Sequence, residues 1–267
     1  MSFWGAMTPF ARRVLAAVTA LVLAFLWLPI AVLVAWSFND SRLNVLWKGF
    51  TLRWYAAAFS DAALLRGLGN SLWVAAWATL VAVPLGTAAA FLFERRRFRG
   101  RDALETLLLL PMIAPEVVIG TSLLALFVAV GQELGFATVI VSHVVFCLPF
   151  VLVAVRARVA SLDPALEEAA QDLGATPGQA FRRVVLPVLA PAIAAAALLS
   201  FMLSFDEVIV TWFTAGAGSR TLPLEIYGRI RRGLDPSLNA ISTVLVVATL
   251  AVVAIATALL RDRGGRR

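Results

Sequence analysis

Charged side chains are scarce in this sequence. Asp, Glu, Lys and Arg make up 15% of the 267 residues, whereas hydrophobic residues make up 61%. An ordinary soluble domain has about 25% charged and about 45–50% apolar residues, so a soluble globular protein is excluded. Nearly uncharged stretches recur along the chain, and each is long enough to cross about 30 Å of hydrocarbon as a helix.

Cysteine, histidine and lysine each occur once. Cys147 lies in an apolar run, which excludes an internal disulfide and any site built from several cysteines. His143 has no His or Cys partner at ligand spacing, so we expect it to pack or to form a hydrogen bond between helices. Lys48 lies in Leu-Trp-Lys-Gly-Phe and not in a G-x-x-x-x-G-K-S/T loop, so this chain lacks the phosphate-binding loop of an ATPase.

Apolar runs predict an all-α membrane protein with six transmembrane helices. The expected spans are Val14 to Trp36, Ser71 to Phe93, Leu104 to Val130, Phe136 to Val155, Val188 to Phe213 and Ala240 to Leu260. The first run follows two arginines, as in a signal peptide, but it exceeds the apolar region of such peptides, which has about 7–15 residues. We therefore expect it to be a retained helix.

Positive charge predicts the orientation of these helices. The net charge is +7, and most arginines lie beside apolar spans, where a membrane surface explains them better than nucleic acid does. If the N-terminus is inside, fifteen Lys and Arg residues fall in cytoplasmic segments and eight in external ones. Since Lys and Arg are retained on the cytoplasmic side, we expect both termini there.

The cytoplasmic segment 156–187 is expected to form two short helices. Asp163 and Pro164 suit the start of the first helix, and Gly174 suits its end. Thr176 and Pro177 repeat the same start signal. The first helix is amphipathic. Its apolar face consists of Leu166, Ala169, Ala170 and Leu173, and its polar face consists of Glu167, Glu168, Gln171 and Asp172. It could contact another protein through small residues and carboxylates, or lie on its own helix bundle.

A motif in this segment resembles the EAA loop of ABC importer permeases. Glu168-Ala169-Ala170, three residues, Gly174, nine residues and then Val184-Val-Leu186-Pro187 match E-A-A-x3-G-x9-I-x-L-P, with only Val184 in place of Ile. In that family the loop forms a coupling helix that seats in a cleft of a cytoplasmic ATPase. The resemblance therefore implies ATPase-coupling roles for Glu168, Ala169, Ala170, Gly174, Leu186 and Pro187.

The same resemblance implies a fold, a domain organisation and partners. It implies a type I importer transmembrane domain over residues 66–260, preceded by a segment 1–65 with the first helix and followed by a basic cytoplasmic tail 261–267. The implied location is the bacterial inner membrane. The partners are a dimer of ABC ATPase subunits, a second homologous permease, a periplasmic or lipid-anchored solute-binding protein and membrane lipids. This chain would hold no cofactor, since ATP and Mg²⁺ would bind to the ATPase.

Three acidic residues in or near the spans are candidates for a substrate pathway. Glu116, Asp206 and Glu207 would each cost roughly 2.5–3.5 kcal/mol inside a bilayer, so they need a polar environment or a partner. Counting about 1.5 Å per residue places Glu116 about 18 Å into its span and Asp206 about 27 Å into its own, hence mid-membrane and near the outer mouth. Pro111 and Pro115 are expected to break the helix near Glu116.

Several interpretations of these acids remain open. They could line a pathway for a cation, or Asp206 and Glu207 could cap a helix or pair with Arg220 or Arg229. A secondary transporter would use them as an ion relay, and a membrane-embedded enzyme would use them in catalysis, but neither explains the loop motif.

Further stretches are similar to the C-type permeases of spermidine/putrescine importers. They are Leu109 to Val118, Ser204 to Thr214 and Thr221 to Ala240. This resemblance implies transport of polyamines or a related organic cation. Related permeases carry phosphonates, opines or ferric iron, so these solutes remain alternatives.

Overall fold

The computed structural model describes residues 8–42, 46–232 and 235–264, and within these ranges it is helical without a strand; part of the basic tail, 265–267, lies outside the described residues. The helices are α1 (Pro9–Ser37), α2 (Arg53–Ser60), α3 (Ala62–Arg95), α4 (Arg101–Ile113), α5 (Glu116–Ala129), α6 (Phe136–Ala160), α7 (Ala165–Asp172), α8 (Pro177–Ala180), η2 (Phe181–Val185), α9 (Leu186–Asp206), α10 (Ile209–Thr214), α11 (Leu222–Arg232) and α12 (Pro236–Gly264). The described residues fall into two compact units, 1–61 with 229–267 and 62–228.

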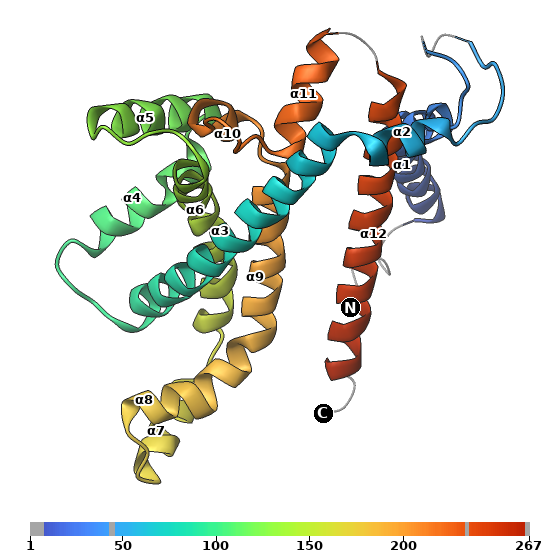
Figure 1. The fold of residues 1–267 in the computed structure, drawn as a ribbon. Coiled ribbons are helices and arrows are strands. Elements are labelled where there is room, and N and C mark those ends of the chain that lie inside the picture. The colour runs from blue at the N-terminus through green and yellow to red at the C-terminus, as the bar shows by residue number, and fades with distance from the viewer. Residues whose placement is uncertain (1–7, 43–45, 233–234, 265–267) are drawn as a thin grey trace. The chain divides into compact units, whose positions relative to one another are not determined.

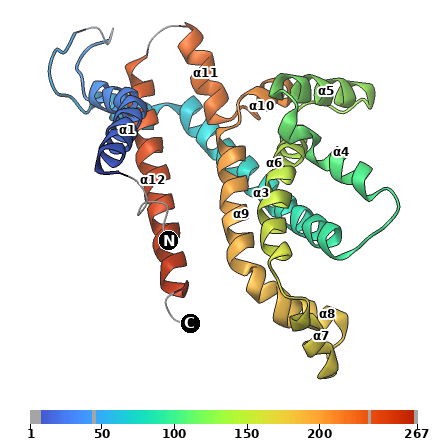
Figure 2. The same ribbon diagram turned by 180° about the vertical axis from the view of Figure 1, so that it is seen from behind.

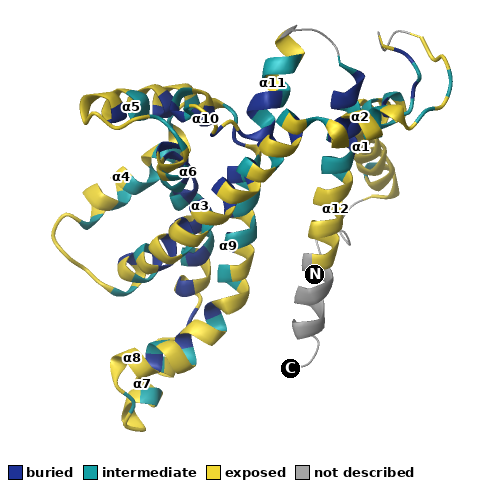
Figure 3. Ribbon diagram, in the orientation of Figure 1, coloured by how far each residue is buried: buried dark blue, intermediate teal, exposed yellow. Residues whose placement is uncertain are grey.

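The prediction of an all-helical membrane protein is confirmed. Within the described residues, five helices are long and apolar enough to cross a membrane, and α4 with α5 makes a sixth span if the bent pair is counted as one. Large apolar side chains on α1 are exposed, such as Leu21 at 71% and Phe25 at 74% (Figure 3). Because lipid is as apolar as these side chains, exposure of this kind suits a helix surrounded by a bilayer.

The unit 62–228 is built on α3, α6 and α9, which lie side by side (Figures 1 and 2). The face of α3 toward α6 carries small residues, including the fully buried Ala75, Ala78 and Ala82. Small residues let helix backbones approach closely, which is a common basis of helix association in membranes. At Gly86 the approach is so close that a Cβ atom would lie 2.7 Å from Cγ1 of Val151.

The third expected span is two helices instead of one. A bend of 114° separates α4 from α5 at Ala114 and Pro115, where the backbone is extended. The break that the prolines predicted is present, and it reverses the chain direction far more than a helix kink does. Helix α4 packs on α6, whereas α5 packs mainly on α10.

The expected fifth span, Val188 to Phe213, was too long. Helix α9 ends at Asp206, the backbone of Glu207 is extended, and α10 starts separately at Ile209. A carboxylate oxygen of Glu207 accepts a hydrogen bond from the backbone N–H of Val210 at 2.8 Å. This side chain satisfies an N–H at the start of α10 and thereby favours the interruption.

The other unit contains α1, α2 and α12, which pack on one another. Asn39 organises the connection after α1, because its side chain bonds to Leu46 O at 2.9 Å and to Lys48 N at 2.8 Å. Arg229 makes two hydrogen bonds to the carboxylate of Asp61, at 2.7 and 2.9 Å. A bidentate pair of this kind fixes orientation as well as distance.

We predict that Gly86→Ala destabilises the protein by about 1–3 kcal/mol, because the added methyl group overpacks the contact with Val151. Thermal unfolding in detergent measures the effect. Gly69→Ala in the same helix is the matched control, since a Cβ there meets nothing within 4 Å. Equal effects of the two glycine substitutions would contradict the packing argument.

Candidate functional site

The three acidic residues singled out in the sequence lie around one cavity. Its volume is about 490 Å³, and its lining consists of Glu116, Asp206 and Glu207 together with Phe146, Leu199, Met202, Leu203, Val208 and Ile209. The acids come from three local settings, namely the start of α5, the end of α9 and the link to α10. An apolar hollow with a few convergent charges is typical of a small-molecule site.

The sequence predicted different depths in the membrane for Glu116 and Asp206, on the basis of two separate straight spans. Both residues line the same cavity. The estimate assumed straight helices, whereas α4 and α5 are bent by 114° immediately before Glu116. The bend brings the first residue of α5 to the last residue of α9.

The three acids differ in whether their carboxylates have hydrogen-bond or ion-pair partners within the fold. Glu207 is 5% exposed and caps α10 through Val210 N, so the capping alternative holds for this residue. Asp206 is exposed and Glu116 is half-buried, and neither has an ion-pair partner among the described residues. These two carboxylates therefore remain available to a ligand.

The expected alternative of an ion pair to Arg220 or Arg229 was wrong. Arg220 lies 3.6 Å from Glu225, and Arg229 pairs with Asp61 and lies 3.7 Å from Asp235. Both guanidinium groups are thus paired with other acids, and nothing in the described residues neutralises Asp206 by direct contact.

His143 braces the wall of the cavity. The ring is fully buried, with Nδ1 at 2.7 Å from Ser204 Oγ and Nε2 at 2.8 Å from Thr211 Oγ1. The Thr211 hydroxyl donates to Glu207 O at 3.0 Å. The expectation of a hydrogen bond between helices is confirmed, and the ring joins α6 to both sides of the break between α9 and α10.

The loop before α9 forms the two short helices that the sequence predicted. Asp163 Oδ1 accepts from Ala165 N at 2.9 Å, and Thr176 and Gln179 bond reciprocally as a capping box. Gly174 has φ +88°, a left-handed conformation that ends α7 and that other residues adopt at a cost. The sequence signals therefore determine this loop locally.

One face of α7 is exposed and the other is attached to the bundle. No residue of α7 is buried (Figure 3). Leu173, the residue after its end, is 90% exposed. Glu168 is exposed as well, whereas Glu167 lies 3.2 Å from Arg95 at the end of α3. The open face matches a surface for another protein, and the neighbouring carboxylate holds the helix in place.

Sequence reasoning missed the residues that connect α7 to the helix bundle. Leu186 and Pro187 are exposed, whereas their neighbours Val185 and Leu189 are fully buried. These two pack in a core with residues of α3 and α6, among them Phe93, Leu152, Val155 and Val159. The apolar spacing of Val185 and Leu189 was a usable signal, but Arg95 had no local signal because its partner is distant in the sequence.

The described residues hold no group of three or more His, Cys, Asp and Glu side chains arranged to bind a metal ion. The carboxylates that line the cavity attract cations and accept hydrogen bonds.

Known proteins resemble this chain in sequence and in structure. The chain is 39% identical over 242 residues to the spermidine/putrescine transport system permease protein PotC of Escherichia coli, covering 91% of this chain and 92% of that protein. It is also 39% identical over 231 residues to the putrescine transport system permease protein PotI of Escherichia coli, covering 84% and 82% of the two chains.

Among solved structures, a chain of a bacterial ABC transporter involved in the import of the acidic polysaccharide alginate matches with a TM-score of 0.74 at 20% identity, covering 95% of both chains. A chain of the MetNI methionine ABC transporter matches with a TM-score of 0.60 at 18% identity, covering 74% of this chain and 93% of that one. These likenesses support the fold. Residues 82–263 match the family of binding-protein-dependent transport system inner membrane components, and the chain belongs to this family.

Proposed function

We propose that this chain is a permease subunit of an ATP-driven importer for polyamines such as spermidine and putrescine. The observation that carries the proposal is the meeting of Glu116, Asp206 and Glu207 at one cavity. A polyamine is a flexible chain with several ammonium groups, and carboxylates around apolar walls suit both its charges and its methylene groups. The names of relatives with 39% identity support the same solute.

The cavity favours a cation over the alternative solutes. Phosphonate and opine carry anionic groups, which three carboxylates would repel. Ferric iron is a cation as well, and the names of relatives with 39% identity favour a polyamine over it.

The proposed partners follow from the exposed surface of α7 and from the family. Glu168, Ala169, Ala170 and Leu173 would contact a cytoplasmic ABC ATPase, which binds ATP and Mg²⁺. A second permease would complete the pathway, and a solute-binding protein would deliver the polyamine. This arrangement assigns both termini to the cytoplasm, the importer domain to residues 66–260 and the segment 1–65 to an additional first helix.

The proposed coupling runs along α9. A displacement of α7 would act on α3 through the Arg95–Glu167 pair and on α6 and α9 through Val185 and Leu189. Helix α9 ends at Asp206, a wall residue of the cavity. Nucleotide-driven closure of the ATPase would thereby favour one of two helix arrangements, with the cavity open to one side of the membrane at a time.

We predict that Glu168→Lys uncouples transport from ATP hydrolysis. Reversal of a charge at a buried interface pair typically costs several kcal/mol, so uptake is expected to fall at least tenfold. The measurement is polyamine uptake and receptor-stimulated ATPase activity of the assembled transporter in vesicles. Normal values for both, with Glu168→Lys present in the membrane at the usual level, would contradict the assignment.

A second variant tests the geometry of the same helix. Gly174→Val strains the left-handed residue that ends α7 and should reduce coupling without preventing membrane insertion. Gly178→Val is the matched control, because Gly178 lies in the same loop without a positive φ and a Cβ there meets nothing within 4 Å.

We predict that Glu116→Gln and Asp206→Asn each weaken polyamine uptake. A hydrogen bond to a charged group contributes about 1.5–3 kcal/mol, so the KM for uptake should rise roughly tenfold or more. Glu133→Gln is the control, since Glu133 is exposed and does not line the cavity. Unchanged KM in both cavity variants, with normal assembly, would return these acids to a structural role.

We predict that His143→Leu raises the KM for polyamine more than His143→Gln does. Leucine offers no hydrogen-bond partner to the hydroxyls of Ser204 and Thr211, whereas the amide of glutamine can both donate and accept hydrogen bonds. Cys147→Ala removes a buried group one turn along α6 and should change KM little. Equal KM for the leucine and glutamine variants would contradict the bracing role.

A further inference from the structure

The segment between α3 and α4 carries an excess of positive charge that the fold does not neutralise. Its arginines are Arg96, Arg97, Arg99 and Arg101, and none of them forms an ion pair with another described residue. Three nearby acids are already engaged, because Glu94 and Glu105 bind Arg156 and Glu167 binds Arg95. Among the described residues, Asp102 is the remaining nearby acid, so four guanidinium groups face one free carboxylate and an excess of positive charge is left.

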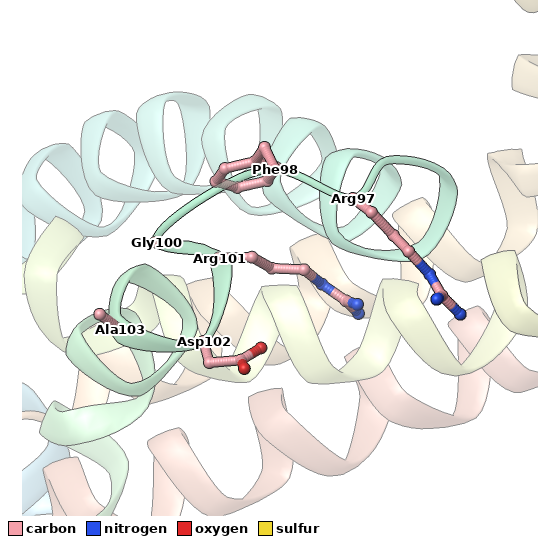
Figure 4. Close-up of a pocket in the computed structure, with 6 residues that line it drawn as sticks. All are labelled: Arg97, Phe98, Gly100, Arg101, Asp102 and Ala103. Carbon is pink, nitrogen blue, oxygen red and sulfur yellow. The ribbon is translucent and has the colours of Figure 1, made fainter.

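Two of these arginines line a hollow at the start of α4. Its volume is about 340 Å³, and its lining is Arg97, Phe98, Gly100, Arg101, Asp102 and Ala103. In Figure 4 the side chains of Arg97 and Arg101 extend toward the same side, and the carboxylate of Asp102 lies nearer to Arg101 than to Arg97. The Nε of Arg101 is shielded from solvent and has no hydrogen-bond partner within the described residues. A buried donor without an acceptor is costly, so an acceptor from a ligand would stabilise it.

A second, apolar hollow continues from the first. Its volume is about 470 Å³, and its lining is Asp102, Ala103, Thr106, Leu107 and Leu110. Asp102 and Ala103 line both hollows, so the two hollows adjoin at the start of α4. Leu107 is 63% exposed and Leu110 is 53% exposed, and the opposite face packs on the bundle through Leu108 and Leu109.

We propose that this face of α4 binds an anionic phospholipid, with the phosphate at Arg97 and Arg101 and an acyl chain along Leu107 and Leu110. Guanidinium groups bind phosphate oxygens in a bidentate manner, and basic clusters beside an apolar span attract anionic headgroups. Asp102 accepts from a hydroxyl of the headgroup, which favours phosphatidylglycerol. The proposal requires only that the chain spans a membrane, and it is independent of the transported solute.

Lipid binding to the intact transporter, purified with its partner subunits in detergent, tests the proposal. Short-chain phosphatidylglycerol should bind on the order of tenfold more tightly than phosphatidylcholine with the same chains, because the zwitterion has no net charge. The double variant Arg97→Gln/Arg101→Gln should lose this preference. Arg12→Gln/Arg13→Gln is the charge-matched control and should keep it, since these exposed arginines line neither hollow.

A steric variant separates lipid from other occupants. Ala103→Phe fills the junction of the two hollows without a change of charge, and it should weaken phosphatidylglycerol binding at least several-fold. Equal binding of glycerol phosphate, which has no acyl chains, would overturn the proposal in favour of a free-anion site. A second result would also overturn the proposal. If the double variant Leu107→Asn/Leu110→Asn loses the second permease from the complex, and the arginine variant keeps its lipid selectivity, this face of α4 is a subunit interface.

Discussion

The close approach of α3 to α6 is the constraint on which the unit 62–228 depends. Alanines and Gly86 on α3 leave so little space that Val151 of α6 occupies the place of a side chain. A hydrophobic effect between helices is largely absent in lipid, so such van der Waals packing carries much of the association. Helix α9 packs on both members of this pair, and its position then determines where its two ends lie.

Those two ends connect the candidate coupling surface to the candidate solute cavity. The 21 residues of α9 span about 30 Å, comparable to the thickness of the hydrocarbon core. At its start, Val185 and Leu189 are buried among residues of α3 and α6, next to the loop of α7 and α8. At its end, Asp206 lines the cavity, and His143 joins the helix to α6 through Ser204.

Charged side chains that support the fold have partners within it, whereas several of those at the two hollows lack one in the described part of the chain. Where carboxylates serve the fold they are paired or capped, as with Glu167 at Arg95 and Glu207 at the start of α10. Asp206 and Glu116 at the cavity, and the arginines after α3, lack such partners within the described residues. Unneutralised charge in or beside a membrane is unfavourable, so each hollow suits the proposed ligand of opposite charge.

The sequence by itself determined the features that depend on local chemistry. Apolar runs gave the spans, the caps at Asp163 and Thr176 and the left-handed Gly174 gave α7 and α8, and the motif from Glu168 to Pro187 identified the family resemblance. Only the tertiary structure decided the 114° bend, the break at Glu207, the Arg95–Glu167 pair and the meeting of the three acids. The ion pair and the meeting of the acids join residues far apart in the chain. A count of rise along straight helices cannot place such residues, because each of the two breaks redirects the chain that follows it.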